Sequence, residues 1–181
     1  MKKILLLINL TLLITACKTP ELRQPINKKR QYTSEKQDDS YKKTMAKEQA
    51  LFKKIREKNT QKKFINSGNG FWYYYISKND KQDAPTAKYS NKVTFNYEVY
   101  SIKGDTIYTQ KELGKRIYYV DQQAIMPGLK DALKILKEGE TAQFFFPSFK
   151  AYGVHGDEKK ITTPNTPLIC KVSVEEITSS D

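Results

Sequence analysis

The stretch PGLKDALKILKEGETAQFFFP at residues 127–147 decides the fold. Its first part repeats apolar residues at i, i+3, i+4 and i+7, which is typical of one face of a helix of about two turns. That face consists of Leu129, Ala132, Leu133 and Leu136. Gly139 stands where such a helix ends. Residues 143–146, a glutamine followed by three phenylalanines, predict a strand that ends at Pro147.

Aromatic or alternating runs on both sides of this stretch predict further strands. In the last run, Leu168, Cys170 and Val172 share one face because side chains alternate along a strand. Residues 77–91 are polar and predict a loop. The expected strands cover residues 71–76, 93–100, 106–108, 117–120, 143–146 and 168–177. We therefore predict an α+β fold, with an antiparallel half-roll of five or six strands wrapped on one short helix.

Charge divides the chain into two parts. The 181 residues carry a formal net charge of +12, and most of it lies in residues 18–66. Residues 67–181 are nearly neutral and hold most of the aromatic side chains. With 38% hydrophobic residues, the chain is too apolar to be wholly disordered and too polar to span a membrane several times. We expect a basic arm that is followed by one domain at residues 67–181.

The N-terminus has the features of an export signal. Lys2 and Lys3 precede an apolar stretch at residues 4–14, which is shorter than the roughly 20 residues of a membrane-spanning helix. Residues 13–17, Leu-Ile-Thr-Ala-Cys, resemble a bacterial lipobox. This resemblance implies a signal peptide at residues 1–16 and a lipid on Cys17 that anchors the chain in a bilayer. The alternative is an ordinary cleaved signal followed by an incidental cysteine.

The basic arm has two parts. Residues 17–40 contain two prolines and few apolar side chains, which predicts a flexible tether. Residues 41–66 are expected to be helical, because residues 41–65 lack glycine and proline, and Leu51 and Ile55 form an i,i+4 pair. A solvated spacer helix is the preferred interpretation, and a homodimer through residues 41–65 is the alternative. We expect no nucleic-acid partner for an exported chain, and an acidic membrane surface or glycan suits the charge better.

Histidine and cysteine are too rare for most cofactor chemistry. The chain has one histidine, His155, which is expected in an exposed loop. It has two cysteines, and Cys170 is expected on the buried face of the last strand as a small apolar residue. We therefore expect neither a metal nor a cofactor.

Five short blocks resemble the FKBP-type peptidyl-prolyl isomerases in order and spacing. They lie at residues 127–133, 137–140, 146–148, 151–153 and 164–168. The resemblance extends over about residues 67–178 and implies an apolar pocket that takes a proline ring. The signal and the arm are similar to lipoproteins of this family that are associated with gliding motility. The resemblance thus implies a lipid-anchored, periplasm-facing envelope protein that acts on proline-containing segments of exported proteins.

The resemblance also implies the residues of the pocket. Tyr97 matches a pocket tyrosine, Ile125 and Met126 match a pair that holds the substrate backbone, and Tyr152 matches a hydroxyl donor. The full set is Tyr97, Ile107, Ile125, Met126, Leu129, Tyr152, Ile161 and Cys170.

Four positions in and beside this set depart from the family pattern. Ile107 and Tyr108 replace a Phe-Asp pair, Leu129 replaces a floor tryptophan, and Cys170 replaces a wall phenylalanine. These departures keep open a second interpretation, in which the domain is a non-catalytic chaperone or docking module.

Overall fold

The computed structural model describes residues 28–81, 84–157 and 162–179, with side chains from residue 39 onward. The chain divides into two units, Met1–Asp38 and Asp39–Asp181. The second unit contains the sheet and the candidate site. The signal peptide, Cys17 and Ile161 lie outside the described residues. No helix in the described part of the chain is both long enough and apolar enough to cross a membrane.

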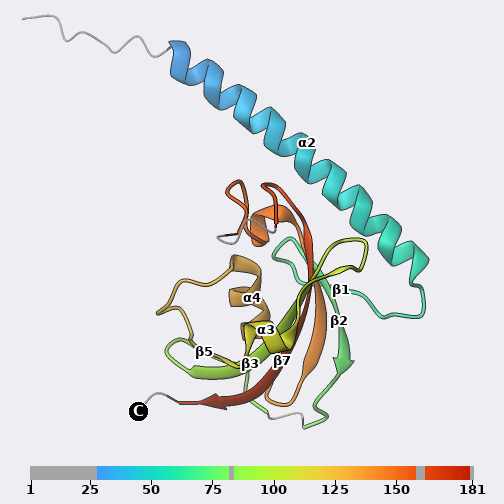
Figure 1. Ribbon diagram of the computed structural model, residues 1–181, viewed down its shortest axis with the longest axis vertical. Helices are drawn as coiled ribbons and strands as arrows, with labels where there is room; N and C mark the ends of the chain where they lie inside the picture. Colours follow the sequence, from blue (N-terminus) through green and yellow to red (C-terminus); the bar gives the residue numbers. More distant parts are fainter. Residues whose placement is uncertain (1–27, 82–83, 158–161, 180–181) are drawn as a thin grey trace, which may run out of the picture. The chain divides into compact units, whose positions relative to one another are not determined.

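The sheet has seven strands among the described residues, and every neighbouring pair is antiparallel (Figure 1). The order is β1-β2-β6-β7-β3-β4, and β5 also pairs with β3. The strands are β1 (Ile65–Asn66), β2 (Trp72–Ser77), β3 (Lys92–Tyr100), β4 (Thr106–Tyr108), β5 (Arg116–Tyr119), β6 (Thr141–Phe146) and β7 (Leu168–Thr178). The expected α+β fold is confirmed, with one strand more than expected.

Helix α4 (Pro127–Ile135) packs against the inner face of the sheet, and together they form the main core. The predicted apolar face is confirmed, because Leu129, Ala132, Leu133 and Leu136 are all buried. Gly128 allows a close approach here, since a Cβ atom at this position would lie 2.6 Å from the Phe146 ring. Only glycine fits such a contact without a shift of the neighbouring strand.

Helix α2 (Lys28–Lys58) begins and ends earlier than the sequence predicts. Residues 28–40 are helical, so the expected tether at 17–40 is wrong for this part. The physical reason is the absence of glycine and proline from 28 to 58, together with Asp39 placed four residues before Lys43. Thr109 and Glu112 form the N-terminal capping box of a further short helix, α3 (Gln110–Leu113), which the sequence analysis did not identify.

The C-terminal end of α2 is set by a side-chain hydrogen bond. Asn59 Nδ2 donates to the carbonyl oxygen of Ile55 at 2.8 Å, which satisfies one of the last carbonyl groups of the helix. The chain then enters β1, whose Ile65 pairs with Tyr73 of β2. The helix therefore ends at Lys58, before the expected end at residue 66.

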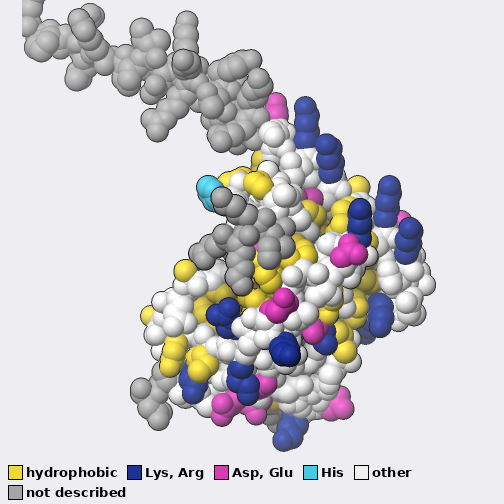
Figure 2. Space-filling model, in the orientation of Figure 1, with side chains coloured by type: hydrophobic (Ala, Val, Ile, Leu, Met, Phe, Trp, Pro, Cys, Tyr) yellow, Lys and Arg dark blue, Asp and Glu magenta, His cyan; other side chains and the backbone are white. Residues whose placement is uncertain are grey.

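The solvated-spacer interpretation of α2 is also wrong for the part in the second unit. Phe52 is only 4% exposed and packs with Phe145 and Ile169 on the outer face of the sheet. Residues 39–66 therefore belong to the same unit as the sheet, and the expected domain boundary at residue 67 is too late. The opposite side of α2 is basic, and Figure 2 shows Lys and Arg side chains along it.

Candidate functional site

A cavity of about 390 Å³ opens at the edge of the sheet beside β3. Its position follows from the strand register. β5 pairs with Lys92–Phe95, and β4 pairs with Val99 and Tyr100, so Tyr97 lies between these two partners. Helix α3 connects β4 to β5 and closes one side. The cavity is lined by Tyr97, Tyr108, Leu113, Arg116, Tyr152, Gly156 and Asp157.

The loop that presents Tyr152 is held by backbone hydrogen bonds. A short 3-10 helix, η1 (Ser148–Lys150), precedes it, and Gly153 N donates to the carbonyl oxygen of Ser148 at 2.9 Å. Asn165 N donates to the carbonyl oxygen of Gly153 at 2.7 Å, which fixes the far side of the loop. These bonds place the half-buried Tyr152 side chain in the cavity wall.

Two carboxylates from other elements hold η1 in place. Lys150 Nζ lies 2.6 Å from Asp131 Oδ2 of α4. On the other side, Ser148 N donates to Glu48 Oε2 of α2 at 2.9 Å. Glu48 is buried, and its second oxygen has no hydrogen-bond partner among the described residues. The support of the Tyr152 loop therefore includes a residue of the arm.

A buried carboxylate, Asp157, forms the polar end of the cavity. It accepts a hydrogen bond from the Tyr108 hydroxyl, and its Oδ1 accepts from Thr162 N at 3.1 Å. Asp157 was not among the expected site residues, because its partner Tyr108 lies 49 residues away and no local motif links the two. The Tyr108 that replaces a family aspartate thus contacts a carboxylate supplied by a different loop.

The cavity tyrosines stay protonated at neutral pH. Burial raises the pKa of Tyr152 and Tyr97, and the positive charge of Arg116 partly offsets the rise at Tyr97. Burial, followed by the hydrogen bond to Asp157, raises the pKa of Tyr108 to about 12. All three hydroxyl groups can therefore donate hydrogen bonds across the physiological range.

The structure brings together only part of the expected residue set. Tyr97 and Tyr152 line the cavity together. Ile125 lines an adjoining cavity, also of about 390 Å³, which shares Tyr97 and Arg116 with the first. His155 is exposed, as expected. Ile161 lies outside the described residues, so its expected place in the wall stays a prediction.

The other expected residues lie in the core instead of lining either cavity. Met126, Leu129 and Cys170 are buried, and Ile107 packs against the same core. The physical reason is size, because leucine and cysteine are shorter than the tryptophan and phenylalanine that the family pattern has at positions 129 and 170. Cys170 is a buried free thiol whose pKa is raised by desolvation, so it is an apolar core residue as predicted.

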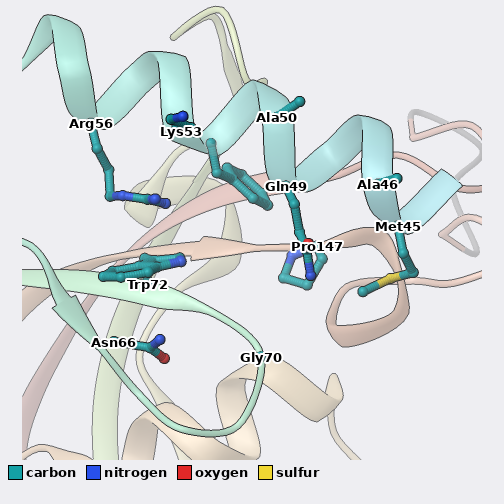
Figure 3. Close-up of a pocket in the computed structure, with 11 residues that line it drawn as sticks. Met45, Ala46, Gln49, Ala50, Lys53, Arg56, Asn66, Gly70, Trp72 and Pro147 are labelled. Carbon is teal, nitrogen blue, oxygen red and sulfur yellow. The ribbon is translucent and has the colours of Figure 1, made fainter. Parts of the chain in front are cut away.

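A third cavity, a groove of about 520 Å³, lies between α2 and β2 (Figure 3). Its walls include Met45 and Gln49 of α2 and Pro147. Figure 3 shows the Arg56 side chain extending from α2 over the Trp72 ring, and the guanidinium carbon lies 3.8 Å from the ring centroid. This contact helps to close the groove. The groove and the tyrosine-lined cavity share no lining residue.

The antiparallel sheet, the helix across its inner face and the tyrosine-lined cavity at its edge define a small α+β half-roll domain. Comparison with known proteins is more specific. Residues 84–175 match the model of the FKBP-type peptidyl-prolyl cis-trans isomerases, and the chain belongs to this family.

Relatives and solved structures agree with this assignment. The chain is 34% identical over 104 residues to a protein of Neisseria meningitidis serogroup B (strain ATCC BAA-335 / MC58) described as "Probable FKBP-type peptidyl-prolyl cis-trans isomerase FkpA". That match covers 58% of this chain and 37% of the relative, so the chain matches well under half of the relative's length.

Two solved structures share the fold. The FkpA structure from Escherichia coli has a TM-score of 0.60 at 23% identity and covers 99% of this chain and 83% of its own. A peptidyl-prolyl cis-trans isomerase from Pseudomonas syringae pv. tomato has a TM-score of 0.60 at 16% identity, covering 76% and 96%. At these identities the likeness concerns the fold alone.

Proposed function

We propose that this chain catalyses the cis-trans isomerisation of peptidyl-proline bonds. The observation that carries the proposal is the cavity in which Tyr97 and Tyr152 present protonated hydroxyl groups within an FKBP-family fold. The barrier to rotation is about 18–20 kcal/mol and arises from amide resonance. A site that binds the twisted imide more tightly than the planar one lowers that barrier without a nucleophile or a general base.

Each cavity tyrosine has a distinct part in this mechanism. Tyr152 is held by the loop after η1, and its hydroxyl donates to a carbonyl oxygen of the substrate. Tyr97 lies in the gap between β4 and β5, where its ring offers an apolar wall to proline. Exclusion of water favours the twisted imide, which is less polar than the planar form.

A second candidate function is peptide binding without useful turnover. The observation in its favour is the polar composition of the cavity, where Arg116 and Asp157 are present while Leu129 and Cys170 lie in the core. Less apolar surface is then available to desolvate a proline ring. The rate of cis-trans exchange of a bound peptide distinguishes the two functions.

Export and lipidation complete the proposal. The chain would be anchored in the cell envelope through Cys17, face the periplasm and act on proline-containing segments of exported proteins, including components of gliding motility. A homodimer through residues 41–65 would need helix surfaces other than Phe52, which is buried against its own sheet. Labelling cells with radioactive palmitate tests the anchor, and Cys17→Ala should remove the label.

The activity is tested by exchange NMR on a Leu-Pro peptide with the full chain. We expect catalysed interconversion that falls about tenfold in Tyr152→Phe, as expected for one lost hydrogen bond of roughly 1.4 kcal/mol. An uncatalysed rate from folded protein that still binds the peptide would favour the binding module instead.

A further inference from the structure

Arg116 opens strand β5, and its side chain is exposed. Side chains alternate along a strand, so Arg116 shares its face with Tyr118, which is buried in the core. The preceding cation, Lys115, forms an ion pair with Glu175 at 2.6 Å. Arg116 instead lines both the tyrosine cavity and the adjoining cavity.

Arg116 has no counter-ion within the described part of the chain. No hydrogen bond or ion pair joins its guanidinium group to another described residue, although Asp157 lines the same cavity. Asp157 accepts from Tyr108 and from Thr162, so both of its oxygen atoms already have donors. The charge of Arg116 is therefore available to a ligand.

The cavity presents several hydrogen-bond donors that a ligand with acceptor groups could satisfy. The hydroxyl groups of Tyr97 and Tyr152 also have no hydrogen-bond partner among the described residues, and both stay protonated. Backbone carbonyl groups of a peptide satisfy hydroxyl donors of this kind. The guanidinium group has a planar set of donors that matches a carboxylate in a bidentate manner.

We infer that this site selects proline segments that carry an acidic residue next to the proline, with Arg116 as the specificity-determining residue. This inference rests on the proposed function, because it assigns a substrate class to the same cavity. A glutamate or aspartate side chain would pair with Arg116 while the tyrosines hold the peptide backbone. A lysine at that place would meet a like charge, and a leucine would leave the guanidinium group without a partner.

The test compares peptides that differ in one side chain. Two sets are needed, one with Glu, Gln, Leu or Lys directly before the proline and one with the same residues directly after it. NMR titration of the full chain gives the dissociation constant for each peptide, and exchange spectroscopy on the same samples gives the rate. We expect the Glu peptide of at least one set to bind up to about fivefold more tightly than its Gln counterpart, since an ion pair at an exposed site contributes at most roughly 1 kcal/mol.

Two variants assign the effect to Arg116. In Arg116→Gln the affinities for the Glu and Gln peptides should become equal within twofold. Lys115→Gln removes the same charge from the neighbouring position, whose side chain pairs with Glu175, and should keep the preference. The matched pair separates a specific contact from the general effect of net charge.

The possible outcomes are distinct. Equal binding of the Glu and Gln peptides by the unmodified chain in both sets, or a preference that survives Arg116→Gln, would overturn the inference. Loss of the Glu preference in Lys115→Gln as well as in Arg116→Gln would also overturn the inference, because net charge would then be the cause. A Glu preference in binding without any catalysed exchange would support the inference and contradict the proposed catalysis.

Discussion

Phe144 and Phe145 are neighbours in β6, and they face two different environments. Phe144 lies on the inner face, stacked on Tyr73 and Phe146 with ring centroids 5.4 and 5.6 Å away. Phe145 lies on the outer face, where it meets Phe52 of α2 at 6.3 Å and Phe64 at 5.3 Å. One strand therefore contributes to two cores of different size.

The two faces differ in how they are covered. The inner face is covered by α4, which directly precedes β6 in the chain, and its core contains most of the buried side chains. The outer face is covered by the C-terminal part of α2, and its core has three buried members with a rim of partly exposed side chains. The comparison indicates that the inner core determines the fold, while the outer core attaches a basic helix to it.

The largest effect is expected from Phe144→Ala. Truncation of a fully buried ring leaves a cavity and should lower the free energy of unfolding by about 3–5 kcal/mol. Urea denaturation followed by circular dichroism measures the change. A loss below about 1 kcal/mol would contradict the view that the inner core determines the fold.

Phe52→Ala applies the same chemical change to the outer core. We expect a smaller loss of about 1.5–3 kcal/mol, the value of one buried aromatic side chain, because α2 can separate while the sheet remains. Hydrogen exchange should show faster exchange in residues 44–58 and unchanged protection in β6 and β7. Equal acceleration in the strands would mean that the two cores unfold as one unit.

Glu48→Ala tests the polar contact between α2 and η1. The change leaves Ser148 N without an acceptor in a buried place, and the expected loss is about 1 kcal/mol. Glu48→Gln keeps an acceptor and serves as the control, with a smaller loss. A shift of the Tyr152 ring signals in Glu48→Ala but not in Phe52→Ala would assign loop positioning to this carboxylate, and unchanged signals would limit Glu48 to attaching the helix.

The smallest effect is expected from Arg56→Ala. The guanidinium group over Trp72 is partly exposed, and such a cation–π contact contributes about 0.5–1 kcal/mol. Arg56→Lys is the matched control, because it keeps the charge and loses the planar stacking. Thermal unfolding should rank the two variants, and no difference from the unmodified chain in either would remove Arg56 from the outer-face attachment.

The inner core could be predicted from the sequence because its elements are strongly periodic. The face of α4 and the alternation of Leu168 to Val174 in β7 are local patterns, and burial follows from them directly. The two-residue strand β1 is too short for any such pattern. Helix α3 did carry a signal, since the Thr109–Glu112 spacing is that of a capping box.

The outer core and the polar part of the cavity depend on distant contacts. Ile169 alternates with polar residues on the face of β7 opposite Cys170, and it is buried because Phe52, more than a hundred residues earlier in the chain, belongs to the same cluster. Asp157 and Arg116 line the same cavity only after β4, β5 and the loop past η1 are in place. Sequence periodicity does not show which distant residues will line one cavity. It does place Arg116 on the same face of β5 as the buried Tyr118, because the two are two residues apart.

The chain contains one tryptophan, Trp72, and it lies on the outer face beneath Arg56. Its emission is therefore an intrinsic optical reporter of helix attachment and is insensitive, by position, to the tyrosine cavity. Denaturation followed by tryptophan fluorescence would record the loss of the outer core, while the twelve tyrosines and the backbone signal would record the rest. Two transition midpoints from these two signals would be the spectroscopic signature of a sheet with separately stabilised faces.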